Sequence, residues 1–193
     1  MRTTFPHSLK ILVRLSLAVF VALLWASCAD NALVSHKYSS MPAKFNFSPV
    51  SAYSQLYTAC NSMGEWSTIR AEGAQFVFSN PTGSTSVNRT QVQNYSGFYM
   101  GLSGFFVGLP NMPELGSDRP VVTCYDLACS NCYHTNSIAK RLTLHTGGKA
   151  TCSNCQRTYD LNNLGQVSQG EGGINLFRYR VFYGNNTLSI QNK

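Results

Sequence analysis

The sequence predicts a small, mainly β domain built from antiparallel strands. The observations behind this prediction are short apolar and aromatic runs, the turn-forming residues that end them, and a composition with only 12% charged residues. The clearest strand pattern lies near the end of the chain, where apolar or aromatic residues from 177 to 183 alternate with Arg178 and Arg180. About eight short strands are expected in all.

The chain from residue 45 to residue 97 is expected to hold two strands and one helix. Pro49 begins a stretch whose apolar positions suit a short helix that ends near Gly64. Residues 79–97 carry few core-forming side chains, and we expect a variable loop or irregular strands there. The strands are placed at Phe45–Phe47 and Gln75–Phe78.

The chain from residue 105 onward is expected to be a succession of strands. Pro110 stops the first of them, and Gly184-Asn185-Asn186 joins the last two as a hairpin. These strands are placed at 105–109, 120–126, 149–151, 157–161, 176–183 and 187–190.

Residues 1–27 are expected to be a secretory signal peptide. Arg2, Lys10 and Arg14 precede an apolar run. This run has about 11 residues, fewer than the ~20 that span a bilayer, and small residues follow it. The sequence therefore predicts export rather than a membrane-spanning helix.

Cys28 directly follows these small residues, an arrangement that resembles a bacterial lipoprotein signal. Loose versions of this signal are common in Bacteroidetes. The resemblance implies that Cys28 carries a lipid, that residues 28–44 form a tether, and that residues 45–193 form the domain. The protein is then held at a membrane of the bacterial cell envelope. An ordinary cleaved signal, with Cys28 incidental, is the alternative.

Length and charge limit the classes of function. About 166 residues follow the predicted signal peptide, which suits one domain with its own core. The net charge of +7 falls to about +4 without that peptide, and it is spread along the sequence. No cluster of Lys and Arg is interleaved with aromatic residues, so a nucleic-acid partner is not expected.

The tetrapeptide Cys-Ser-Asn-Cys occurs twice, at Cys129–Cys132 and at Cys152–Cys155. Two CxxC pairs at this separation are a strong signature of a metal knuckle. Asn is relatively at ease in the left-handed backbone region, so it suits the tight turn of a knuckle. We expect a rubredoxin-like or zinc-ribbon-like two-knuckle subdomain at about 120–165. Its predicted metal ligands are Cys129, Cys132, Cys152 and Cys155.

Four sulfur ligands select zinc or iron. The sequence leaves three possible states of these cysteines. Zinc is favoured because it can be loaded after export of an unfolded chain and would stabilise the fold by joining two loops. Iron, as a single ion or as a 2Fe–2S cluster, is the second possibility. Two disulfides are the third, since an exported protein meets an oxidising compartment.

The remaining cysteines and the histidines receive less specific predictions. Cys60 and Cys124 form either a disulfide or two buried free thiols. His134 is expected to be a solvated loop residue, because four cysteines already complete a site. His145 lies in an alternating stretch, 142–145, and is expected to be a surface residue of a strand. The chain has only 8 acidic residues, which are scattered, and no catalytic residue is predicted.

The chain from about residue 104 to residue 190 resembles a Rieske domain. The strand Pro120–Asp126 leads to Cys129 as a strand of that family leads to its first metal loop, and Cys152–Cys155 is followed by Tyr159-Asp160 as in its second loop. The resemblance implies a small Rieske-like antiparallel β domain and an iron–sulfur site. Further matches are Gly165, the turn Gly170–Gly173 and the closing strands at 178–181 and 187–190.

The ligands depart from the Rieske pattern. The family has a histidine two residues after its first cysteine, where this chain has Asn131, and another three residues after its second cysteine, where this chain has Cys155. Cys132 and Cys155 would stand in for the two histidines. Two histidines on one iron raise the potential of a Rieske cluster, and four thiolates would not do so.

Three functional hypotheses follow. The first is a non-enzymatic surface protein with structural zinc, and the second is an electron-transfer protein with an iron–sulfur or single-iron centre. The third is a surface binding domain stapled by disulfides. None of them names a substrate or a protein partner.

Overall fold

The structure of this chain is a computed structural model that describes residues 38–91, 93 and 97–192. The predicted signal peptide, the predicted lipid site at Cys28 and residues 29–37 of the predicted tether lie outside these residues. No helix in the described ranges is long and apolar enough to cross a membrane.

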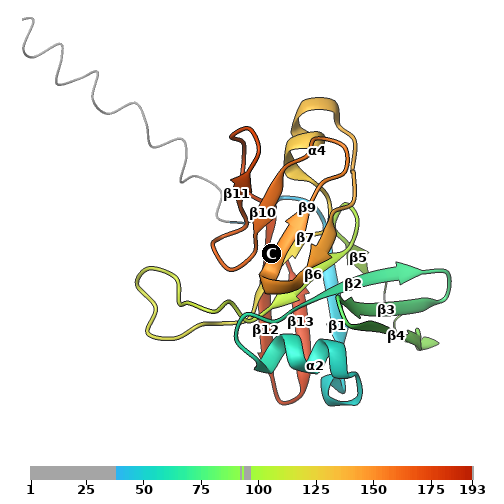
Figure 1. The fold of residues 1–193 in the computed structure, drawn as a ribbon. Coiled ribbons are helices and arrows are strands. Elements are labelled where there is room, and N and C mark those ends of the chain that lie inside the picture. The colour runs from blue at the N-terminus through green and yellow to red at the C-terminus, as the bar shows by residue number, and fades with distance from the viewer. Residues whose placement is uncertain (1–37, 92, 94–96, 193) are drawn as a thin grey trace, which may run out of the picture. The chain divides into compact units, whose positions relative to one another are not determined.

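Two antiparallel sheets form the domain, which is mainly β as the sequence predicted (Figure 1). The larger sheet has nine strands, in the order β4 (Gly83–Asn88), β3 (Gln75–Asn80), β2 (Trp66–Glu72), β6 (Phe105–Gly108), β7 (Thr123–Asp126), β12 (Arg178–Gly184), β13 (Thr187–Gln191), β1 (Ala43–Phe47) and β5 (Tyr99–Met100). The smaller sheet has four, in the order β11 (Gln166–Gln169), β10 (Thr158–Asp160), β9 (Lys149–Thr151) and β8 (Thr143–His145). The helices are α2 (Ser54–Asn61), α4 (Ser130–Asn136) and the short 3-10 turns η2 (Val50–Ala52) and η3 (Thr146–Gly148).

The larger sheet folds over so that its two ends face each other. β12 pairs with β7 at its first two residues and with β13 over the rest of its length. The sheet therefore bends at β12. As a result, β1 faces β3. Phe45 packs edge-on against Phe76 with ring centroids 5.0 Å apart, and Phe47 packs against Phe78 at 4.8 Å. Such aromatic pairs add to the stabilisation from burial alone.

Buried side chains form two separate clusters. The first, which we call the sheet core, lies inside the folded larger sheet and under α2. The second, which we call the cysteine core, lies where the smaller sheet meets the larger one. The sheet core includes Phe45, Phe47, Leu56, Cys60, Ile69, Phe76, Phe78, Phe105, Cys124, Tyr179, Leu188 and Ile190. The cysteine core includes Trp66, Phe106, Tyr125, Leu127, Cys129, Cys132, Leu142, Ala150, Cys152, Tyr159, Leu161 and Leu176.

The predicted helix and the predicted terminal hairpin are confirmed. α2 ends at Asn61, close to Gly64, where the chain turns with a positive φ. In the hairpin, Asn185 and Asn186 have φ values of 49° and 59° and form the two-residue turn between β12 and β13. Two successive positive φ values match the twist of the paired strands, which is why Asn is favoured at these positions.

Other elements differ from the sequence prediction. β1 begins at Ala43, so the last residues of the segment expected as a tether belong to the sheet. β2 was not predicted, because Ser67 and Thr68 are buried together with Trp66 and interrupt the apolar alternation. β4 lies in the stretch left as a loop or irregular strand, and it forms a regular ladder with β3.

Candidate metal centre

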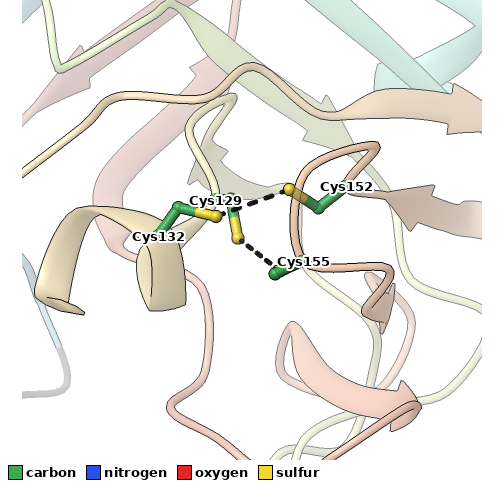
Figure 2. Close-up of side chains that lie close together, drawn as sticks. All are labelled: Cys129, Cys132, Cys152 and Cys155. Carbon is green, nitrogen blue, oxygen red and sulfur yellow. Dashed lines mark hydrogen bonds between the residues drawn. The ribbon is translucent and has the colours of Figure 1, made fainter. Parts of the chain in front are cut away.

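Four cysteine sulfurs gather between the start of α4 and the loop that joins β9 to β10 (Figure 2). All four lie within 4.8 Å of one another. The sulfurs of Cys129 and Cys155 are 3.5 Å apart, and those of Cys132 and Cys152 are 3.7 Å apart. The fold therefore brings the two Cys-Ser-Asn-Cys segments together as the sequence predicted.

The first segment is positioned by the end of β7 and the start of α4. The Cys129 N–H donates to the carbonyl of Lys140 at 2.7 Å, which closes the loop on itself. Cys129 is the N-cap residue of α4, and Cys132 lies in the first turn of this helix. The two sulfurs are thus about one helical turn apart, the spacing that lets i and i+3 side chains share a face.

The second segment is a tight turn between β9 and β10. The Cys152 N–H donates to the Arg157 carbonyl, and the Gln156 N–H donates to the Cys152 carbonyl, both at 2.9 Å. The left-handed residue of this turn is Gln156, with φ of 58°. The expectation that Asn supplies this conformation was wrong. Asn131 is helical, and Asn154 does not have a positive φ.

The site is buried on three of its four corners. Cys129, Cys132 and Cys152 are at most 3% exposed, whereas Cys155 is partly exposed. Burial raises the pKa of Cys129 to about 12 and also raises the pKa of Cys132. Burial acts in the same direction on Cys155. There it is outweighed by hydrogen bonds from the backbone and side chain of Arg157 and from two neighbouring thiols, which lower its pKa to about 7.

Hydrogen-bond donors reach the sulfurs from outside the ligand set. The Asn154 amide donates to the Cys132 sulfur at 3.3 Å, and the Tyr159 hydroxyl lies 3.1 Å from the Cys129 sulfur. The Asn131 amide donates to the Tyr159 oxygen at 2.7 Å. Burial is the main cause that raises the Tyr159 pKa to about 12. Tyr159 therefore keeps its proton and can donate it toward the sulfur. Such donors stabilise thiolates and tune a bound metal.

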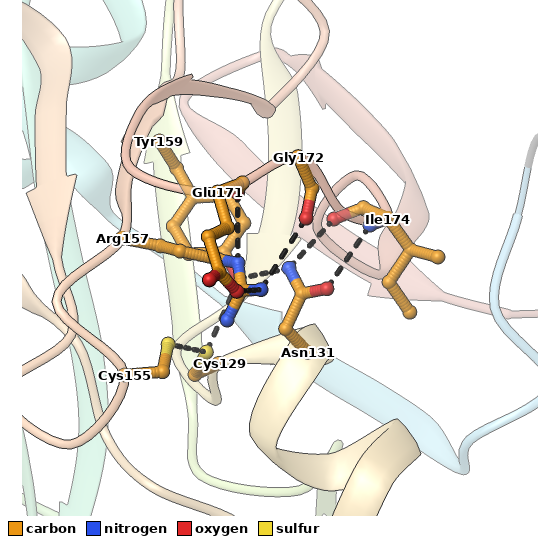
Figure 3. Close-up of polar contacts among 8 residues, drawn as sticks. All are labelled: Cys129, Asn131, Cys155, Arg157, Tyr159, Glu171, Gly172 and Ile174. Carbon is orange, nitrogen blue, oxygen red and sulfur yellow. Dashed lines mark hydrogen bonds and ion pairs between the residues drawn. The ribbon is translucent and has the colours of Figure 1, made fainter.

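A glycine-rich segment, Gly170–Ile174, passes beside the site, and we call it the strap (Figure 3). The Asn131 amide oxygen accepts from the Ile174 N–H at 3.1 Å, and its nitrogen donates to the Ile174 carbonyl at 3.2 Å. The Arg157 guanidinium donates to the carbonyls of Glu171 and Gly172 at 3.0 and 3.3 Å. The turn at 170–173 was predicted from its glycines, but its hydrogen bonds with the side chains of Asn131 and Arg157 were not predictable from sequence.

The sulfur positions suit a single tetrahedral ion. Four thiolates bound to one zinc ion at about 2.3 Å would lie about 3.8 Å apart. The separations of 3.5 Å between Cys129 and Cys155 and 3.7 Å between Cys132 and Cys152 are close to this value. Cys129, Cys132, Cys152 and Cys155 would be the ligands, and the set of four sulfurs fits zinc or iron chemically.

The other cysteines and the histidines lie apart from this cluster. Cys60 and Cys124 are both buried in the sheet core, and burial raises the pKa of each thiol. The disulfide proposed between them stays a prediction. His134 lies on α4 and His145 on β8, and both are exposed. Neither belongs to the one metal-binding group found among the described residues.

No family model, curated protein or solved structure matches this chain.

Proposed function

We propose that this protein is an exported, lipid-anchored, non-enzymatic protein of the cell envelope, whose four cysteines hold a structural zinc ion in a Rieske-like domain. The observation that carries the metal site is the convergence of four sulfurs from two separate loops within 4.8 Å. Buried thiols with raised pKa values are costly to ionise, and a metal ion compensates this cost directly.

The pairing of the sulfurs supports one ion over a Rieske-type cluster. In a Rieske cluster the two cysteines share one iron and the two histidines share the other. By the resemblance, Cys129 and Cys152 would then share one iron, and Cys132 and Cys155 the other. Sulfurs bound to different irons of a cluster lie farther apart than sulfurs bound to one ion. Here all four sulfurs lie within 4.8 Å of one another, and Cys129 and Cys155, which such a cluster would place on different irons, are only 3.5 Å apart. This compact arrangement favours a single ion that all four sulfurs surround.

A zinc ion bound by these four cysteines would stabilise the fold and would have no catalytic role. Four sulfur ligands leave no open position for water or substrate, which is typical of structural zinc sites. The ligands tie the start of α4 to the loop between β9 and β10. The donors Tyr159, Asn154 and Arg157 would offset the excess negative charge of four thiolates around a divalent ion.

Electron transfer through an iron centre is the second candidate function. The contacts of Tyr159 with the Cys129 sulfur and of Asn154 with the Cys132 sulfur favour it, because hydrogen bonds to sulfur raise the reduction potential of iron–sulfur centres. The order of strands and loops that resembles a Rieske domain supports the same reading.

Elemental analysis of the purified protein, with an absorption spectrum and a free-thiol count, tests these functions against each other. About one zinc per chain without a visible band is the expected result. Iron with sulfide and a visible band would contradict the zinc proposal and support electron transfer. A protein without metal and without free thiols at the four positions would contradict both and leave a disulfide-stapled binding domain.

Substitution of one ligand tests the assignment of the site. Cys155→Ser should abolish stoichiometric zinc binding, because a neutral hydroxyl replaces a thiolate ligand. Cys60→Ala is the matched control, since it removes a cysteine from the sheet core and leaves all four ligands in place. Loss of zinc in both variants, or retention in both, would contradict the assignment.

Export and lipidation rest on the amino-terminal sequence and have their own test. Wild-type protein should fractionate with membranes and carry a mass increment from lipid at Cys28. Cys28→Ser should be released from membranes. Soluble wild-type protein of unmodified mass would contradict the lipid anchor without affecting the metal proposal.

A further inference from the structure

The two identical tetrapeptides differ in what their central residues contact. Asn154, in the second copy, donates its amide to the Cys132 sulfur. Asn131, in the first copy, donates to Tyr159 and makes two hydrogen bonds with the backbone of Ile174. The serines differ as well. Ser130 is fully buried and donates to the Ile174 carbonyl at 3.3 Å, whereas Ser153 is exposed. The first copy therefore holds both a metal ligand and the strap.

Arg157 provides a second connection between the strap and the site. Its guanidinium donates to the strap carbonyls of Glu171 and Gly172, and its backbone carbonyl accepts from the N–H of the ligand Cys152. The Arg157 side chain is only 17% exposed, whereas the Glu171 carboxylate that also meets it is 93% exposed. The hydrogen bonds from Arg157 to the strap carbonyls are thus better shielded from solvent than its ion pair with Glu171. Cys155 is the only partly exposed ligand, so the strap is anchored beside the most accessible corner of the site.

The strap approaches Asn131 more closely than a side chain would allow. A Cβ atom added to Gly173 would lie 2.2 Å from the Asn131 amide oxygen and 2.6 Å from its nitrogen. A Cβ atom added to Gly172 would meet nothing within 4 Å. Neither glycine has a positive φ, so alanine causes no backbone strain at either position. Only the first substitution would force the Asn131 amide and the strap apart and so disrupt the hydrogen bonds between them.

We propose that Asn131 acts as a latch that holds the strap Gly170–Ile174 against the four-cysteine site and thereby slows the exchange of the bound ion. This inference rests on the proposed metal site. Asn131 is a positioning residue, since its contacts are with Tyr159 and the strap rather than with a sulfur.

The test compares four variants of the full-length protein loaded with zinc. Asn131→Ala and Gly173→Ala remove the latch, whereas Asn154→Ala and Gly172→Ala are matched controls at the equivalent repeat position and at the adjacent glycine. One readout is the rate of zinc transfer to a chromogenic chelator. The other is hydrogen exchange of the backbone amides in residues 170–175. Asn131→Ala removes both hydrogen bonds between Asn131 and the Ile174 backbone, and Gly173→Ala disrupts them, so each latch variant should speed zinc transfer by about tenfold or more. Each should also speed exchange of the strap amides.

The controls define the outcomes. Gly172→Ala should leave both rates unchanged, and Asn154→Ala should leave exchange of the strap amides unchanged. If Gly173→Ala frees the strap amides but transfers zinc at the rate of Gly172→Ala, the latch proposal is overturned while the metal site stands. If wild-type protein contains no zinc, both proposals fail, and the zinc content of the wild type separates this result from the first.

Discussion

At the scale of single residues, the main unusual group outside the metal site is the carboxylate of Asp126. It is fully buried, and it accepts hydrogen bonds from the N–H groups of Leu102 and Ala128 and from the Tyr179 hydroxyl. Ala128 directly precedes the ligand Cys129, so this carboxylate helps to fix the entry to the first metal loop. Buried carboxylates are tolerated only when several donors satisfy them.

Removal of one hydrogen-bond donor to the Asp126 carboxylate should lower the stability of the fold. Tyr179→Phe takes away the hydroxyl that lies 2.6 Å from Asp126, and it should lower the free energy of unfolding by about 1.5–3 kcal/mol. Urea denaturation measures this change. Tyr183→Phe is the control, because its hydroxyl accepts a hydrogen bond from Asn61 at the surface. Equal losses in the two variants would contradict a special role for the buried contact.

Asp126 also predicts a pH dependence. Burial raises the pKa of Asp126 above its ordinary 3.8, against the lowering effect of its hydrogen bonds. A carboxyl whose folded pKa is raised stabilises the fold below the ordinary pKa and loses this contribution as the pH rises through the folded value. The cost of Asp126→Asn should therefore be smaller at about pH 7.5 than at about pH 4.5. Urea denaturation of both proteins at both pH values tests this, since effects of the cysteines are common to both and cancel. A cost that grows with pH would contradict it.

At the scale of elements, the hairpin between β12 and β13 does more than reverse the chain. The Asn186 side chain accepts from the Ser51 N–H and donates to the Ser51 hydroxyl, both at 2.7 Å, and its carbonyl accepts from the Val50 N–H at 3.0 Å. The hairpin tip thereby holds η2, which leads into α2. The sequence predicted the turn from its Asn residues, but it could not show this long-range contact.

This contact reverses the usual preference for glycine at the second turn position. Asn186→Gly keeps a residue that tolerates positive φ but loses two side-chain bonds to Ser51, and it should cost about 1 kcal/mol. Asn185→Gly loses no such bond and should change stability by less than about 0.5 kcal/mol. Thermal unfolding compares the two. A more stable Asn186→Gly variant would show that turn preference outweighs the contact.

The elements also show where sequence patterns are informative. β1, β3 and β13 were predicted from short apolar or aromatic runs and from the terminal hairpin, and in each strand buried positions alternate with less buried ones. β2 is buried on both faces at its start, and Ser67 there donates to the Ser79 carbonyl of β3 rather than facing solvent. A polar residue with a partner in the core is indistinguishable from a surface residue when only its type is known.

At the scale of the whole molecule, the two cores have different dependence on the metal. The ligands Cys129, Cys132 and Cys152 belong to the cysteine core, whereas the sheet core is filled by aromatic pairs and contains none of them. Trp66 of β2 is one link between the larger sheet and the cysteine core, since it stacks on Tyr125 and donates to Asn162 at 3.0 Å.

Metal removal should therefore act locally. After treatment with a chelator, backbone amides of α4, β9 and β10 should exchange hydrogen much faster, whereas those of β2, β3 and β6 should change little. Hydrogen-exchange mass spectrometry measures this difference. A uniform increase across both sheets would show that the domain unfolds as one unit without its metal.

The ligands of the site were predictable from sequence, and their surroundings were not. Two identical tetrapeptides name four sulfurs, because cysteine spacing in metal knuckles is set by local backbone geometry. Asn131 and Asn154 look equivalent in sequence, but α4 holds the first in a helix and directs it toward the strap. Roles that depend on which distant segment lies nearby follow from the tertiary fold alone.

Two close sulfur pairs, 3.5 and 3.7 Å apart, each join one cysteine from the first segment to one from the second. If the metal is lost and an oxidant is present, these neighbours are the pairs placed to form bonds: Cys129 with Cys155 and Cys132 with Cys152. Such bonds would span the two loops rather than close a small ring inside either segment. The domain would then keep its loops together in a second chemical form, with a covalent link in place of the ion.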